Sequence, residues 1–198
     1  MRPVRTRAPV RSLLLVAFVA CAYPVWTLAA SAGRPAVGAV SLAWFGGVAA
    51  LWFAGFLIPL SLALVPARGQ VVPDGGRAFR AALVIGVALF CVSLIGGEGG
   101  RPVALTSSSW HDCLLRGLKL GAPTIVAGAL ALRRLLLVDS WRLGAALGAA
   151  GGSLAGLTLH LTCARTSPSH VALAHAGGLA LAALLGTLAV PPLVRSKR

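Results

Sequence analysis

The stretch that decides the fold is residues 40–65, VSLAWFGGVAALWFAGFLIPLSLALV, which contain no charged residue. The uncharged run around it extends from Pro35 to Ala67. A helix needs about 20 apolar residues to cross the hydrocarbon core of a bilayer, so this run is longer than one crossing and too short for two. Its apolar residues are continuous and do not alternate as the strands of a membrane β-barrel would. We therefore expect one membrane-spanning helix here, in an all-α protein.

Similar apolar stretches, separated by charged residues, fill the rest of the chain. The chain has 198 residues, of which 58% are hydrophobic and only 11% charged, and this composition excludes a soluble core. The first stretch is expected to be a retained helix, because its uncharged run from Ser12 to Gly33 exceeds the usual signal-peptide core of about 7–15 residues. We expect one transmembrane helical-bundle domain over residues 1–198, with six spans at approximately 12–31, 40–65, 81–95, 113–132, 143–163 and 170–190.

The basic residues between these spans predict the orientation of the bundle. Thirteen Lys and Arg residues fall on one side of the bilayer, and only Arg34, Arg101 and Arg165 fall on the other. Because cytoplasmic loops carry the excess of Lys and Arg, both termini are expected in the cytoplasm. The net charge of +14 is then explained by residues that orient helices, so we expect no direct binding of nucleic acid.

Cysteine and histidine gather on the opposite, external side. Cys163 closes the fifth expected span and Cys113 opens the fourth. Such thiols can bind soft metals, react with oxidants or form a disulfide, or they can be small apolar residues at helix ends. Imidazoles can bind metal, titrate between about pH 5 and 8, or act as interfacial anchors. His170 and His175 are not expected to share a face, because residues five apart are separated by about 140° on an α-helix. The candidate imidazoles are His111, His160, His170 and His175.

The fifth span carries a stripe of glycines at intervals of four. Such a stripe lets another helix approach closely. Its face spirals, because each step of four residues drifts by about 40°. His160 is the next residue at this interval and is expected to point toward a neighbouring helix instead of toward lipid. The stripe consists of Gly144, Gly148, Gly152 and Gly156.

Two cations in the fourth span, Arg116 and Lys119, allow a different interpretation. Facing inward, they would make a nearby thiol more reactive or line the path of a small transporter or channel subunit, whereas facing outward they would reach the interface. A membrane thiol oxidoreductase is a further alternative, which should show a CxxC pair or a quinone-adjacent thiol pair, and the four cysteines form no CxxC pair. No Ser-His-Asp pattern, paired-carboxylate motif or phosphate loop is visible, so an enzyme is disfavoured.

The chain resembles the NrsF family, negative regulators of sigma F. These are six-span anti-sigma factors of the bacterial inner membrane that act on extracytoplasmic-function sigma factors. The resemblance rests on RPVR before the first span, a cysteine opening the fourth span, LRR at its inner end, a glycine-rich fifth span and a closing cysteine block. The family's closing block is roughly His-Cys-Pro-Glu-Asp-Ser followed by an apolar helix start. The residues that match it here are Cys163, Ser167, Val171 and His175.

The chain departs from the family pattern in two respects. In the closing block, Thr162 replaces the usual histidine, Ala164 and Arg165 replace Pro-Glu, and Ala174 stands where tryptophan is common. The family also usually has a cytoplasmic segment of roughly one helix ahead of RPVR, whereas this sequence starts at Met1 directly before it. Either the true start lies upstream, or this member lacks a sigma-contacting element.

The resemblance implies a function as well as a fold. The cytoplasmic side would sequester a sigma factor, and Cys113 with Cys163 would sense metal or oxidative stress on the external side. The only cofactor it suggests is a transiently bound soft or transition metal ion, and the partners are the sigma factor and the lipid bilayer. We expect the fifth helix to transmit the signal by sliding or tilting on its glycine face. The candidate partner-binding residues are Arg2, Arg5, Arg7, Arg68, Arg77, Arg133 and Arg134.

Overall fold

The structure, a computed structural model, describes residues 9–30, 42–66, 73–95, 109–133, 137, 139–163 and 167–195. Within these ranges the chain forms six helices and no strand, which confirms the all-α prediction. The last of these helices is continuous and consists of a short α-helical start, one π-helical turn and a long α-helix. The elements are α1 (Pro9–Ala30), α2 (Leu42–Leu64), α3 (Gly75–Ile95), α4 (Ser109–Leu132), α5 (Ser140–Thr162), α6 (Pro168–His170), the π-helical turn η2 (Val171–Ala176) and α7 (Gly177–Arg195).

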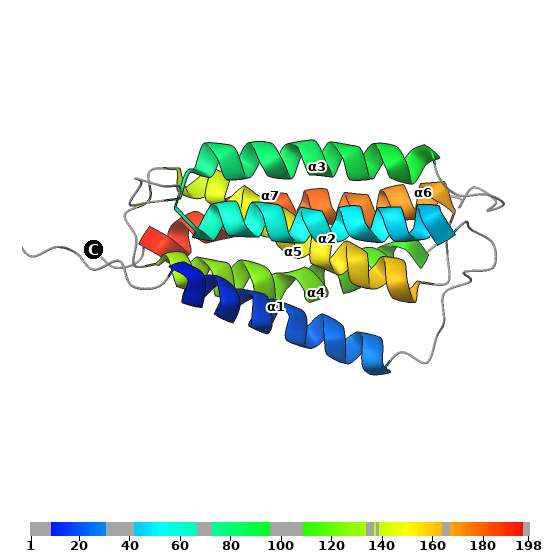
Figure 1. The fold of residues 1–198 in the computed structure, drawn as a ribbon, viewed down its shortest axis with the longest axis horizontal. Coiled ribbons are helices and arrows are strands. Elements are labelled where there is room, and N and C mark those ends of the chain that lie inside the picture. Colours follow the sequence, from blue (N-terminus) through cyan, green and yellow to red (C-terminus); the bar gives the residue numbers. More distant parts are fainter. Residues whose placement is uncertain are drawn as a thin grey trace, which may run out of the picture.

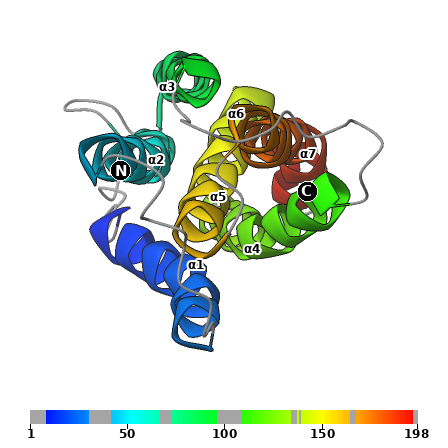
Figure 2. The same ribbon diagram turned by 90° about the vertical axis from the view of Figure 1, so that its right-hand side faces the viewer.

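The helices lie side by side along the long axis and alternate in direction, so that α1 begins and α7 ends at the same end of the bundle (Figure 1). Seen along this axis, α5 occupies the centre and the other helices surround it (Figure 2). It contacts α1, α2, α3, α4, η2 and α7. The end at which the described part of the chain starts and finishes is called the inner end below, and the opposite end is called the outer end.

Four of these helices are long and apolar enough to cross a membrane. The apolar part of α1, Leu13–Ala29, is shorter, and α5 does not meet the same measure of apolarity. Most residues of α5 are buried against the other helices, so this helix can consist largely of alanine and glycine without exposing a weakly apolar surface. By contrast, α1, α3 and α7 expose large apolar side chains such as Phe18, Val84 and Leu188. These exposed side chains suit a hydrocarbon environment. The four apolar helices are Leu42–Leu64, Gly75–Leu94, Trp110–Leu132 and Val171–Val194.

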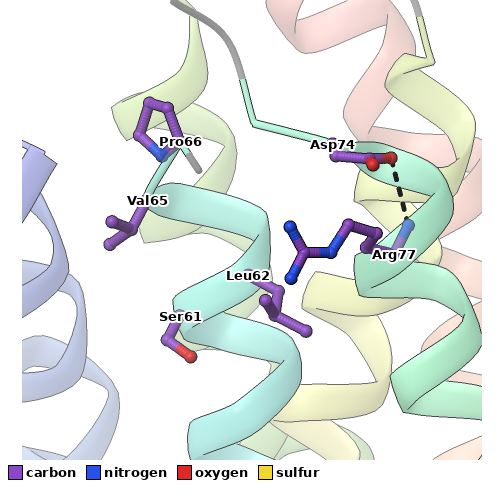
Figure 3. Close-up of a pocket in the computed structure, with 6 residues that line it drawn as sticks. All are labelled: Ser61, Leu62, Val65, Pro66, Asp74 and Arg77. Atoms are coloured by element: carbon purple, nitrogen blue, oxygen red, sulfur yellow. Dashed lines mark hydrogen bonds between the residues drawn. The ribbon is translucent and has the colours of Figure 1, made fainter. Parts of the chain in front are cut away.

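The third helix begins earlier than its charge pattern predicts. The expected span starts at residue 81, but α3 starts at Gly75 and has 21 residues, so it is not a short span. The cause is Asp74, whose Oδ1 accepts hydrogen bonds from the backbone N–H groups of Gly76 at 2.9 Å and Arg77 at 3.1 Å. Figure 3 shows the bond to Arg77. This is the geometry of a helix N-cap, which satisfies donors that would otherwise lack partners in the first turn.

Replacing Asp74 by alanine is expected to destabilise the protein by about 1 kcal/mol, because both capping hydrogen bonds are lost. Asp74→Asn keeps an acceptor oxygen at this position and is expected to retain most of the stability. Thermal denaturation of the purified protein in detergent measures the difference. Equal transition temperatures for the wild type and Asp74→Ala would show that this cap does not stabilise α3.

The glycine stripe of α5 faces other helices, as predicted. A Cβ atom at Gly144 or Gly148 would strike the α7 backbone at Gly186 and Ala182, respectively. At Gly152 it would lie 2.6 Å from the Cα of Leu179. Further along, Gly156 faces the indole of Trp52 on α2, so the stripe turns from α7 to α2 as a straight α-helix requires. The contact of Gly144, Gly148 and Gly152 with α7 is called the α5–α7 seam.

A second glycine contact, between α5 and α4, was not predicted. A Cβ atom at Gly151 would lie 2.6 Å from the carbonyl oxygen of Gly121, and one at Gly121 would lie 3.0 Å from that of Gly151. The two backbones therefore touch, which only small residues permit. Because Gly121 and Gly151 stand outside the four-residue stripe, the spacing within α5 alone does not reveal their partnership.

Candidate functional site

The two outer-end cysteines come from different helices. Cys113 is the fifth residue of α4, and Cys163 is the C-cap of α5. The extended backbone of Cys163, with φ −78° and ψ 125°, ends the helix, while its N–H still donates to the carbonyl of Leu159 at 2.7 Å. Both side chains are half-buried. Helix termination therefore aims Cys163 at the start of α4.

The sulfur atoms of Cys113 and Cys163 lie 3.9 Å apart. A disulfide bond is about 2.0 Å long, so the sulfurs would have to approach by about 2 Å to form one. Two sulfurs at the observed separation could equally bind one metal ion between them. The other described cysteines, half-buried Cys21 on α1 and exposed Cys91 on α3, belong to no such cluster.

His170 and His175 share a face, contrary to the expectation from an α-helix. Their ring centroids lie 5.5 Å apart with nearly perpendicular planes. The reason is η2, in which backbone hydrogen bonds connect residues five apart, as from Gly177 N–H to Ala172 O. Residues i and i+5 then stand above one another, which a 3.6-residue turn prevents. No feature of the sequence predicts this turn.

His170 joins the thiols, and its Nε2 lies 3.5 Å from the Sγ of Cys163. The ligand atoms of Cys113, Cys163 and His170 all lie within 4.8 Å of one another. Among the described residues this is the one group of three or more His, Cys, Asp or Glu side chains that could hold a metal ion. We call Cys113, Cys163, His170 and the adjacent His175 the outer cluster.

The remaining two histidines stand apart from this cluster. His160 is buried, stacks on Phe45 with ring centroids 4.4 Å apart, and places Nε2 3.1 Å from the carbonyl oxygen of the same residue. It therefore points toward a neighbouring helix, as the glycine interval predicts, and this helix is α2. His111 is exposed and stacks on the neighbouring Trp110. Its position two residues before Cys113 does not bring it into the group of possible metal ligands.

The cations Arg116 and Lys119 are exposed on the surface of α4, with Asp112. A transporter or channel path would require them to face a cavity inside the bundle, and they do not. An inward position beside the thiols is excluded for the same reason. Near the outer end of the helix, their long side chains can extend to the interface with water.

The described partner-binding candidates, Arg77 and Arg133, are exposed at the inner end. Arg77 borders a hollow of about 280 Å³ between the end of α2 and the start of α3, where Leu62, Val65 and Pro66 supply apolar walls (Figure 3). The other candidates, Arg2, Arg5, Arg7, Arg68 and Arg134, lie outside the described residues.

The fold and the outer cluster define a helical membrane protein with a thiol pair at one end of its bundle. Residues 1–195 match the NrsF family, described as negative regulator of sigma F, and the chain belongs to this family. The resemblance seen in the sequence is thereby confirmed over nearly the whole chain. No curated protein and no solved structure matches the chain significantly. The family description identifies a regulator whose partner is a sigma factor.

Proposed function

We propose that this protein is an anti-sigma factor of the bacterial inner membrane. It holds an extracytoplasmic-function sigma factor at its inner end and releases it when Cys113 and Cys163 bind a thiophilic metal ion or are oxidised. The observation that carries the proposal is the 3.9 Å separation of two sulfurs that stand fifty residues apart in the chain. A pair so close can respond as a unit to one ion or one oxidant.

The proposed topology has six crossings, with both termini in the cytoplasm. Two observations support it: the helices alternate in direction (Figure 1), and most basic residues of the sequence fall before α1, between α2 and α3, between α4 and α5, in the first turns of α1, α3 and α5, or near the end of the chain. In this arrangement α5 crosses the membrane surrounded by the other helices. It has little contact with lipid and therefore does not need large apolar side chains. The outer cluster then faces the periplasm.

In this proposal the inner end is the docking surface for the sigma factor. Arg77 extends over the hollow at the end of α2, and its guanidinium approaches Leu62 (Figure 3). An exposed cation beside apolar walls suits an amphipathic segment that presents acidic and apolar side chains. Arg133 adds a second exposed cation at the same end.

Coupling between the two ends would pass through α5 and α7. The outer cluster takes Cys163 from the end of α5, while His170 and His175 precede α7 in the same continuous helix. Below the cluster, the α5–α7 seam brings the two backbones into contact as far as Gly144, near the inner end. A change in the relative position of the two helices at the cluster would therefore be transmitted along a contact made largely by backbone atoms.

Co-purification tests the proposal. Membranes containing the tagged protein should retain one of the extracytoplasmic-function sigma factors of the same genome. The double variant Arg77→Gln/Arg133→Gln should bind it at least about tenfold more weakly, because two inner-end cations are lost. The matched control is Arg116→Gln/Lys119→Gln, which removes two exposed cations from the outer part of α4. Failure of every such sigma factor to co-purify would refute the anti-sigma function.

A further inference from the structure

The outer cluster contains more potential metal ligands than the thiol pair requires. His170 is 0% exposed and His175 is 2% exposed, so both rings lie inside the protein. Nε2 of His170 faces the Sγ of Cys163 at 3.5 Å. The ring of His175 packs edge-on against that of His170, with centroids 5.5 Å apart. Two sulfurs and one imidazole nitrogen, from three helices, therefore lie within 4.8 Å of one another, and the ring of His175 lies beside that of His170.

The nitrogen atoms of these imidazoles are poorly satisfied. Nδ1 of His170 and both ring nitrogens of His175 are buried without a hydrogen-bond partner of normal geometry. Buried polar atoms without partners are rare in proteins, because removing them from water costs free energy. A metal ion bound between the rings and the thiolates would use Nε2 of His170 and one nitrogen of His175, so it would give a partner to a nitrogen of His175 that otherwise has none.

The distances fit a tetrahedral ion. Around Zn²⁺, with Zn–S bonds of about 2.3 Å and Zn–N bonds of about 2.0–2.1 Å, two sulfurs lie about 3.8 Å apart and a sulfur and a nitrogen lie about 3.6 Å apart. The corresponding separations in the outer cluster are 3.9 Å and 3.5 Å. The positions of Cys113, Cys163 and His170 thus need little adjustment to take such an ion.

The π-helical turn η2 has a role in this arrangement. If residues 171–176 were α-helical, His170 and His175 would point about 140° apart, and only one of them could reach the thiols. Isolated π-helical turns are uncommon and are frequently found at functional sites. Here the turn places both rings on the side of the helix that faces Cys163.

We propose that Cys113, Cys163, His170 and His175 form a tetrahedral site for a divalent metal ion of the Zn²⁺ class, with η2 as the element that completes it. This inference rests on the proposed function and specifies the signal that the thiol pair receives. Two thiolates and two imidazoles are the donor set that favours Zn²⁺. The two thiols lose their protons to solvent on binding, so a site with two thiolates and one divalent ion has no net charge, as burial requires.

Metal titration of the purified, reduced protein in detergent tests the site. Co²⁺ serves as the probe, because tetrahedral thiolate coordination gives intense visible bands and a near-ultraviolet sulfur-to-cobalt band, and Zn²⁺ should displace it. Cys113→Ser and Cys163→Ser should abolish these bands. His170→Gln and His175→Gln should each weaken binding at least tenfold and reduce the intensity of the visible bands. His111→Gln and His160→Gln, which alter histidines outside the cluster, should bind as the wild type does.

The substitution His170→Cys distinguishes the loss of a metal ligand from misfolding of the protein. It supplies another soft ligand at the same position, so binding should be largely retained while the sulfur-to-cobalt band grows. Binding that depends on both cysteines but is unchanged in His170→Gln and His175→Gln would overturn the four-ligand site and leave the thiol-pair regulator intact. Absence of Co²⁺ and Zn²⁺ binding in a protein that still retains its sigma factor would overturn the metal inference alone.

Discussion

Replacing Gly148 by leucine is expected to abolish the response to external stress. The new Cβ would strike the backbone of α7 at Ala182, and backbone atoms cannot rotate aside as a side chain can. Overpacking of this kind typically costs 1–3 kcal/mol, and relief requires α7 to move away from α5. With the α5–α7 seam opened, the outer cluster no longer controls the inner end. A sigma-dependent reporter should therefore show the same expression with and without the stimulus.

The matched control for this variant is Gly47→Leu. A Cβ at Gly47 on α2 meets nothing within 4 Å, so the same substitution there adds bulk to open space. Its reporter response should equal that of the wild type. Western blots of the membrane fraction establish that both variants are inserted at comparable levels. If Gly148→Leu is present in the membrane and responds to the stimulus as strongly as Gly47→Leu, the seam does not transmit the signal.

The second large effect is expected from Cys163→Ser, which should reduce the stress response of the reporter to its uninduced level. Serine keeps the size of the side chain but removes a ligand for soft metals and the redox-active sulfur. Because the two sulfurs act as a pair 3.9 Å apart, Cys113→Ser should have the same effect, and the double variant should be no worse than either single one.

Cys91→Ser provides the control for this pair. Cys91 is exposed on α3 and belongs to no described group of metal-binding residues, so its loss should leave the response unchanged. Additive effects of Cys113→Ser and Cys163→Ser would contradict a shared site. A normal response in either single variant would exclude the thiol pair as the sensor.

Much of the fold follows from the sequence, because continuous apolar runs cut by charges specify helices in a bilayer. The expected ranges lie close to α1, α2, α4 and α5. The predicted start of α3 is wrong, because it assumes that the helix cannot begin before the charged residue Arg80. The helix begins instead after its N-cap Asp74, and Arg77 and Arg80 in its first turns are exposed. Local capping chemistry determined this boundary, and the hydropathy of the span did not.

The site was less predictable than the fold. Topology alone indicates that Cys113 and Cys163 lie at the same end, but their 3.9 Å separation depends on how α4 packs against α5. That packing is partly set by Gly121, whose contact with α5 has no signature in the sequence of α4. The expected separation of His170 and His175 was wrong, because it assumed 3.6 residues per turn. Whether residues 171–176 form a π-helical or an α-helical turn depends on their packing in the folded protein, and the pattern of apolar residues in the sequence does not reveal it.

The most direct test of the central claim is a release measurement on membranes that hold the protein and its sigma factor. A thiophilic metal salt or a thiol oxidant is added, the membranes are sedimented, and the sigma factor is quantified in the pellet and the supernatant. The wild type should lose most of the bound sigma factor to the supernatant after treatment, while Cys163→Ser should retain it in the pellet. Retention by the treated wild type, or equal release from Cys163→Ser, would contradict regulation of the sigma factor by the outer thiol pair.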